Sequence, residues 1–141
     1  MEACIMVIED NQDIRELLCD LLTDEDYAVA VYASPEAAIG DIDRVKPDLI
    51  ILDWLFDRKP LGLQMLQSLR LRSGWKGIPV VICSGANRHL ESMEPHLHRR
   101  GAQVVYKPFL ADELLDVVRA ALQPAQPLSI AIRQPYAAAA Q

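Results

Sequence analysis

The sequence predicts a doubly wound α/β domain, in which helices cover both faces of a parallel sheet. Short runs rich in Ile, Val and Leu alternate with helical patterns five times along the chain, and three of these runs are continuously apolar. Continuous apolar runs are typical of strands that are buried on both faces of a parallel sheet. Right-handed crossovers then place the helices on the two faces. A chain of 141 residues is long enough for one such domain with a real core.

The five predicted strands are short segments between polar or helical stretches. "CIMVI", "DLIIL" and "IPVVIC" are continuously apolar, which predicts the centre of the sheet. "AVAVY" and the shorter "QVVY" complete the set. The predicted strands span residues 4–8, 28–32, 48–52, 78–83 and 103–106.

Five helices are predicted from apolar spacing and from capping residues. The clearest stripe, over residues 14–22, repeats at i, i+3 and i+4 and follows Asn11 as a cap. Ser34 followed by Pro35 is a start signal for a second helix, which must end before Pro47. The others are predicted around residues 63–69, over 87–100 with a proline inside, and over 110–121.

Composition narrows the class of protein. The net charge of -6 argues against direct binding to a nucleic-acid backbone. Cys4, Cys19 and Cys83 are widely spaced and form no CxxC pair, so neither a disulfide framework nor a zinc site is indicated. The apolar run near the N-terminus is too short for a signal peptide or a membrane span. We therefore expect a cytoplasmic protein that does not enter a membrane.

The composition changes after Leu122. Residues 124–141 are rich in proline and alanine and carry no periodic stripe long enough for another domain. We interpret residues 1–123 as one domain and residues 124–141 as a flexible tail. The run "LSIAI" inside the tail is equally compatible with an added edge strand and with disorder. With no helix-turn-helix pattern or second catalytic domain after Leu122, we expect output through docking on another protein, or a domain excised from a longer chain.

Reactive side chains follow four of the five predicted strands. Glu9 and Asp10 come after the first strand, Asp53 after the third, Ser84 after the fourth and Lys107 after the fifth. The carboxyl ends of parallel strands meet at one edge of the sheet, where such folds place their sites. We therefore expect three carboxylates, a hydroxyl and an ammonium group to lie together.

This set of groups suits phosphoryl transfer. Clustered carboxylates repel one another unless a cation joins them, and Mg²⁺ prefers oxygen ligands and retains water. An aspartate can act as a nucleophile toward phosphorus if a metal and a positive side chain neutralise the transferring oxygens. Lys107 supplies the positive charge, and Ser84 can donate a hydrogen bond to a phosphoryl oxygen. Asp53 is the predicted acceptor.

The motifs "VIEDN", "LIILDWLF", "VICSGA" and "YKPF" occur in this order on the alternating frame. Over residues 4 to about 122 the chain resembles a receiver domain of the two-component response-regulator family. The resemblance implies a flavodoxin-like fold with strand order 2-1-3-4-5. It also implies that Asp53 is the phosphoacceptor, and that Lys107-Pro108 is a cis peptide.

The same resemblance assigns further roles. It implies that Asp10 and Asp53 bind Mg²⁺ directly with the backbone carbonyl of Leu55, and that Glu9 binds it through water. Ser84 and Lys107 would hold the phosphoryl group. The implied donor is a histidine kinase or a histidine phosphotransfer protein, and the implied target is another protein. Only self-phosphorylation and slow self-dephosphorylation are expected, so the chain is not predicted to be an enzyme.

Three positions depart from the family pattern. Asp57 stands where the family usually has proline, and Gly62 falls one residue late, so we expect a longer acceptor loop. Asp57 is either solvated or an additional carboxylate near the metal. Val104 occupies the usual aromatic position, while Tyr106 directly precedes Lys107. We therefore expect activation to be transmitted through residues 84–100 and not through an aromatic rotamer switch.

Three other functions are alternatives. A phosphohydrolase of the haloacid-dehalogenase type would resemble DxD, where this chain has Leu55. An FMN-binding flavodoxin would need a phosphate cradle where the chain places acidic residues. A receiver-like interaction module that is never phosphorylated is the third. The "HLHRR" run at 96–100 is interpreted as the cationic end of a helix, and Trp54 and Trp75 as either partner contacts or loop packing.

Overall fold

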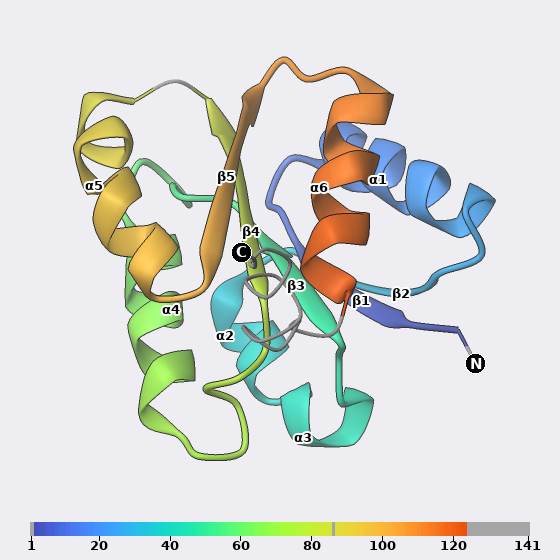
Figure 1. The fold of residues 1–141 in the computed structure, drawn as a ribbon, viewed down its shortest axis with the longest axis horizontal. Coiled ribbons are helices and arrows are strands. Elements are labelled where there is room, and N and C mark those ends of the chain that lie inside the picture. The colour runs from blue at the N-terminus through green and yellow to red at the C-terminus, as the bar shows by residue number, and fades with distance from the viewer. Residues whose placement is uncertain (1, 86, 124–141) are drawn as a thin grey trace, which may run out of the picture.

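The computed structural model describes residues 2–85 and 87–123. Five parallel strands form one sheet in the order β2-β1-β3-β4-β5, with helices on both sides (Figure 1). The predicted class and strand order are therefore confirmed. The strands are β1 (Cys4–Ile8), β2 (Ala28–Tyr32), β3 (Leu49–Leu52), β4 (Val80–Gly85) and β5 (Ala102–Lys107).

Helices cover the sheet in two layers (Figure 1). On one face lie α1 (Gln12–Asp24) and α6 (Ala111–Leu122). On the other face lie α2 (Pro35–Ile39), α3 (Ile42–Val45), α4 (Leu61–Leu71) and α5 (Arg88–Arg99).

Strand β3 shows why the central strands are continuously apolar. Successive side chains of a strand point to opposite faces of the sheet. Leu49 and Ile51 pack in the core under α1 and α6, whereas Ile50 and Leu52 pack in the core under the other helices. All four side chains are buried. A sheet covered on both faces leaves no position in this strand for a polar side chain until Asp53.

Side-chain caps begin three of the helices. The Asn11 side chain accepts a hydrogen bond from Ile14 N–H at 3.0 Å at the start of α1. Ser34 Oγ accepts from Ala37 N–H at 3.2 Å before α2, and Pro35 is the first residue of that helix. Asn87 caps α5 in the same way. The capping roles predicted for Asn11 and Ser34 are confirmed.

The single helix predicted between Ser34 and Pro47 is wrong, because the chain forms two short helices with a break at Gly40 and Asp41. Gly40 lowers helix propensity at the break. The Asp41 carboxylate accepts hydrogen bonds from the Tyr32 hydroxyl and from the Arg44 guanidinium, both at 2.7 Å. These contacts with β2 and α3 stabilise the interrupted path.

Two predicted strand boundaries also move. Strand β4 begins at Val80 and continues through Gly85, so Ser84 lies inside the strand and not after it. Lys107 likewise is the last residue of β5. The cause is pairing between the two strands, which continues to the Gly85 and Lys107 register.

Other predictions concern segments outside the sheet. Trp75 is 6% exposed and donates from Nε1 to Asp43 Oδ1 at 2.8 Å, so it packs the loop before β4. The predicted tail over residues 124–141, with its "LSIAI" run, lies outside the described residues. No helix within the described ranges has the length and apolar character needed to cross a membrane.

Candidate functional site

The β1–α1 connection holds Glu9 and Asp10 at the carboxyl end of the sheet. Glu9 is 2% exposed, and its Oε2 accepts a hydrogen bond from Asn11 N–H at 3.1 Å. Its backbone carbonyl accepts a hydrogen bond from Arg15 Nη1 at 2.7 Å. The backbone of Glu9 is therefore held from α1 while its side chain turns into the site. Asp10 is exposed at the rim.

The Asp53 carboxylate accepts four hydrogen bonds. Its Oδ1 accepts from Trp54 N–H at 2.6 Å, from Leu55 N–H at 3.3 Å and from Ser84 Oγ at 2.5 Å. Its Oδ2 accepts from Lys107 Nζ at 3.0 Å. Asp53 is 8% exposed, so this carboxylate is nearly enclosed and its position is set by the donors around it.

Lys107 joins two carboxylates from different strands. Its Nζ lies 2.6 Å from Glu9 Oε1 and 3.0 Å from Asp53 Oδ2. Burial by itself would lower the pKa of Lys107, but the hydrogen bond to Glu9 and the charge of Asp53 outweigh it and raise that pKa. Burial raises the pKa of Glu9, and the hydrogen bond from Lys107 opposes that rise. Lys107 is therefore held in its charged form.

Three carboxylates are close enough to share a cation. Glu9, Asp10 and Asp53 each offer a carboxylate oxygen, and these oxygens lie within 4.8 Å of one another. Two of these residues are buried and one is exposed, so the group opens to solvent on the Asp10 side. Hard oxygen ligands with access to water fit Mg²⁺. Asp57 is not among the grouped carboxylates of the described chain and is exposed, which favours its interpretation as a solvated residue.

The acceptor loop contains a tight turn. Phe56 and Lys59 form an antiparallel bridge, with N···O distances of 2.9 Å and 3.0 Å. The two residues between them, Asp57 and Arg58, have φ values of 51° and 64°. Two consecutive left-handed residues are typical of a type I′ turn, which favours Asn-Gly. The longer loop that the sequence predicts is thus folded back on itself.

Gly62, in the first turn of α4, sits directly against the acceptor backbone. Its N–H donates to the Trp54 carbonyl at 3.1 Å. A Cβ at this position would lie 2.1 Å from the Asp53 carbonyl oxygen and 2.9 Å from Trp54 Cα. Only glycine allows this approach. In the sequence Gly62 is recognisable as a displaced glycine, but no pattern there predicts this contact.

Two aromatic residues connect the site to α5. The Trp54 side chain is fully buried, with its ring centroid 5.4 Å from that of His89. Trp54 therefore packs in the core and is not exposed to a partner. The Tyr106 hydroxyl donates a hydrogen bond to the Glu94 carboxylate, which ties β5 to α5. Sequence reasoning missed this bond and the Arg15 contact, because each joins residues whose partners become visible only in the folded chain.

The structure places every predicted site side chain at one edge of the sheet. Glu9, Asp53, Ser84 and Lys107 are joined by hydrogen bonds, and Asp10 completes the carboxylate group. Their functional roles stay predictions, as does the ligand role of the Leu55 carbonyl. The Lys107-Pro108 peptide is cis, as the resemblance implies.

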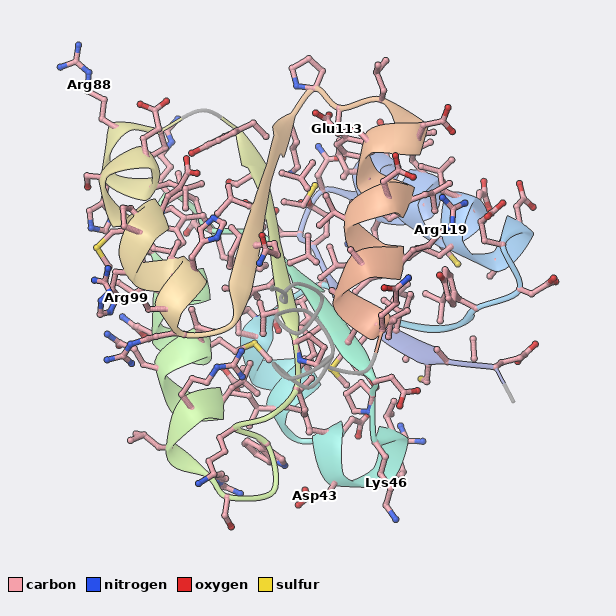
Figure 2. All side chains as sticks on the ribbon, in the orientation of Figure 1. Asp43, Lys46, Arg88, Arg99, Glu113 and Arg119 are labelled. Carbon is pink, nitrogen blue, oxygen red and sulfur yellow. The ribbon has the colours of Figure 1, made fainter. Side chains whose placement is uncertain are left out.

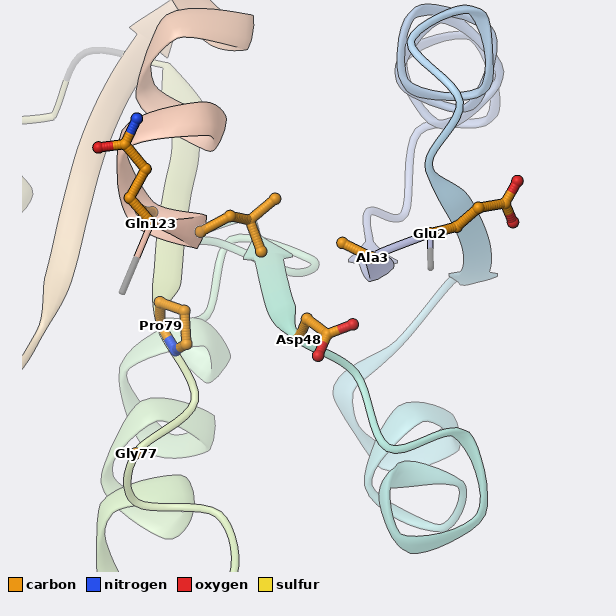
Figure 3. Close-up of a pocket in the computed structure, with 8 residues that line it drawn as sticks. Glu2, Ala3, Asp48, Gly77, Pro79 and Gln123 are labelled. Atoms are coloured by element: carbon orange, nitrogen blue, oxygen red, sulfur yellow. The ribbon is translucent and has the colours of Figure 1, made fainter. Parts of the chain in front are cut away.

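A cavity of about 560 Å³ opens at the opposite edge of the sheet (Figure 3). Residues that precede β1, β3 and β4 line it, together with the end of α6. None of the predicted site residues reaches this cavity. Its lining is Glu2, Ala3, Asp48, Gly77, Pro79, Ala121, Leu122 and Gln123.

Sequence comparison relates this arrangement to known proteins. The family model of the response regulator receiver domain matches residues 5–119. The phosphate regulon transcriptional regulatory protein PhoB of Escherichia coli K12 is 27% identical over 126 residues, which cover 89% of this chain and 54% of that protein. The nitrogen assimilation regulatory protein NtrX of Azorhizobium caulinodans is 30% identical over 120 residues, covering 84% and 26%. The chain thus spans about half the length of PhoB, or less of NtrX.

Structural comparison agrees. The receiver domain of NtrX from Brucella abortus is 31% identical, with a TM-score of 0.74, and the match covers 86% of this chain and 99% of that one. The chemotaxis protein CheY4 of Vibrio cholerae is 22% identical with a TM-score of 0.76, covering 86% and 100%. The likeness to CheY4 shows the fold alone.

Proposed function

Because the chain belongs to the response regulator receiver domain family, we propose that it is a phosphoacceptor module in which Asp53 takes a phosphoryl group from a phosphohistidine. The observation that carries this proposal is the environment of Asp53. Its two carboxylate oxygens contact Ser84 and Lys107, beside the carboxylates of Glu9 and Asp10. A hydroxyl donor, a fixed positive charge and a group of metal-binding oxygens thus surround one nucleophile.

The transfer forms one bond and breaks another. An Asp53 carboxylate oxygen forms a bond to phosphorus while the P–N bond of the donor phosphohistidine breaks. Mg²⁺ held by Glu9, Asp10 and Asp53 would supply neutralising charge for the transferring oxygens. Ser84 and Lys107, which now donate to Asp53, would donate instead to oxygens of the phosphoryl group. Both groups thus lie within reach of the acceptor atom before transfer.

The proposed partners follow from this chemistry. A histidine kinase or a histidine phosphotransfer protein would present the phosphohistidine, and the phosphorylated chain would dock on a further protein in the cytoplasm. The sequence has no P-loop or Gly-rich nucleotide motif. We propose self-phosphorylation and slow self-dephosphorylation as its only chemical activities.

The test uses a small phosphoryl donor and the mass of the intact protein. Incubation with Mg²⁺ and acetyl phosphate should add one phosphoryl group, and a chelator should prevent the addition. Asp53→Asn should abolish the mass gain. Asp57→Asn is the matched control, because this exposed aspartate lies in the same loop and outside the carboxylate group. It should be phosphorylated like the unmodified chain.

The outcomes separate the three classes of function. A mass gain that survives Asp53→Asn, or that maps to Ser84, would reject the proposed mechanism. No mass gain under any condition would favour an interaction module that is not phosphorylated. Rapid, repeated hydrolysis of the donor without accumulation of phosphoprotein would favour a phosphohydrolase.

A further inference from the structure

Charged residues are segregated along this chain. Residues 1–57 contain 15 Asp and Glu but only three Lys and Arg, whereas residues 58–111 contain nine Lys and Arg but only two Glu. The first segment includes α1, and the second includes α4 and α5, which cover the opposite face of the sheet (Figure 1). The fold therefore converts a difference along the sequence into oppositely charged surfaces on two sides of the molecule.

The positive side has a distinct centre, which we call the basic corner and define as Arg70, Leu71, Arg72, Arg99 and Arg100. Arg70 donates to the Arg100 carbonyl at 2.7 Å, which holds the end of α4 against the end of α5. Leu71 is 86% exposed. Figure 2 shows Arg99 on the outer side of α5. Within the described ranges, none of these arginines forms a salt bridge with a carboxylate.

The negative side has a corresponding feature on α1, which we call the acidic stripe. Asp13, Leu17, Asp20 and Asp24 follow one another at spacings of four, three and four residues, which places them on one face of a helix. All four are exposed, and Leu17 is 47% exposed. The stripe and the corner have the same composition with opposite sign: an exposed leucine between charged side chains.

Each feature has an ordinary explanation when taken singly. Cations are favoured at helix C-termini, and isolated exposed leucines are common on protein surfaces. Neither explanation accounts for the match between two separate surfaces of one chain. We propose that the basic corner of one copy binds the acidic stripe of a second copy, with Leu71 and Leu17 in the apolar centre of the contact and the charges around it.

A nucleic acid is the less suitable occupant of the corner. Single-stranded nucleic acids bind where exposed aromatic rings stack on bases beside positive charge. The aromatic residue nearest in sequence, Trp75, is 6% exposed, and the Arg72 guanidinium lies 4.2 Å from its ring centroid. The net charge of -6 also opposes association with a polyanion.

The proposed contact joins two different surfaces, so it is heterologous. A pair formed in this way retains a free corner at one end and a free stripe at the other, and larger assemblies therefore form as concentration rises. Exposed charges are screened by salt, with a Debye length of about 3 Å at 1 M. The assembly should therefore be weak and sensitive to ionic strength.

Sedimentation velocity of the full chain, without a phosphoryl donor, tests the proposal independently of phosphorylation. At low salt the average mass should rise with concentration, and at about 1 M salt it should return to that of the monomer. Arg99→Glu/Arg100→Glu and Asp13→Lys/Asp20→Lys should each remain monomeric at low salt. Leu71→Ser should weaken assembly without changing its salt dependence. Arg88→Glu, an exposed cation at the other end of α5, is the matched control and should assemble normally.

Mixing the two double variants gives the decisive measurement. The corner variant retains an intact stripe and the stripe variant retains an intact corner, so an equimolar mixture should form a dimer that does not grow further. Circular dichroism should show that both variants are folded. A wild-type chain that stays monomeric at low salt, or an equimolar mixture that forms no dimer, would overturn the proposal. Oligonucleotide binding that the corner variant loses, without self-association, would assign the corner to nucleic acid instead.

Discussion

Two loops deliver carboxylates to the candidate site, and they are built differently. The β1–α1 connection is short and is stabilised by contacts of Asn11 and Arg15, which are close in sequence to Glu9. The β3–α4 connection is longer, includes the turn at Asp57 and Arg58, and depends on a backbone contact from Gly62.

The difference separates two ways of positioning a reactive group. In the first loop, side chains adopt ordinary conformations and satisfy nearby backbone groups, so local substitutions should have moderate effects. In the second, the acceptor backbone is pressed against a helix, and no adjustment of a flexible side chain can relieve an added atom. The acceptor loop should therefore be much less tolerant at its point of contact, yet tolerant at its exposed turn.

Gly62→Ala should have the largest effect. Its Cβ would overlap the Asp53 carbonyl oxygen, so the acceptor backbone must move. We expect the free energy of unfolding to fall by about 3 kcal/mol or more, measured by urea denaturation, and phosphorylation of Asp53 to be impaired. Gly74→Ala is the control, because a Cβ there meets no atom within 4 Å. Equal stability of the two variants would show that the acceptor loop adapts freely.

Arg15→Ala should have the next largest effect. The substitution removes a charged donor from the Glu9 carbonyl, and we expect a loss of about 1.5–3 kcal/mol in the free energy of unfolding. Weaker Mg²⁺ binding, followed by tryptophan fluorescence, should accompany it. Arg119→Ala is the matched control, since its salt bridges are exposed and should contribute about 0–1 kcal/mol. If the two variants are equally stable, Arg15 does not hold the first loop.

Asn11→Ala should cost about 1 kcal/mol through loss of the cap of α1. Thermal and urea unfolding measure this change, and Asn11→Ser should restore most of it because serine also caps helices. A loss well above that value, not restored by serine, would show that Asn11 supports the carboxylate group by another route.

The double substitution Asp57→Asn/Arg58→Gly should have the smallest effect, and of opposite sign. Asn-Gly suits two consecutive left-handed residues, so we expect stabilisation by about 0.5–1 kcal/mol with phosphorylation retained. The measurement is urea denaturation alongside the mass assay. A destabilised double variant would mean that the Asp57 or Arg58 side chain contributes a contact of its own.

Much of the fold and of the site was predictable because it depends on short-range patterns. Continuous apolar runs identify strands covered on both faces, and the residue after such a strand is at the edge of the sheet whatever follows. For this reason the amino-acid sequence alone places Glu9, Asp10 and Asp53 together. Asn11 and Ser34 were equally accessible, because a cap and the N–H group that it satisfies are three residues apart.

Tertiary structure decided what depends on distant partners. The helix break at Asp41 requires the Tyr32 hydroxyl from β2, and the extension of β4 through Ser84 requires pairing with β5. The need for glycine at position 62 arises from the Asp53 backbone, which no local pattern places there. A sequence window records propensity and periodicity, whereas steric contact and hydrogen bonding between distant segments exist only once the chain has folded.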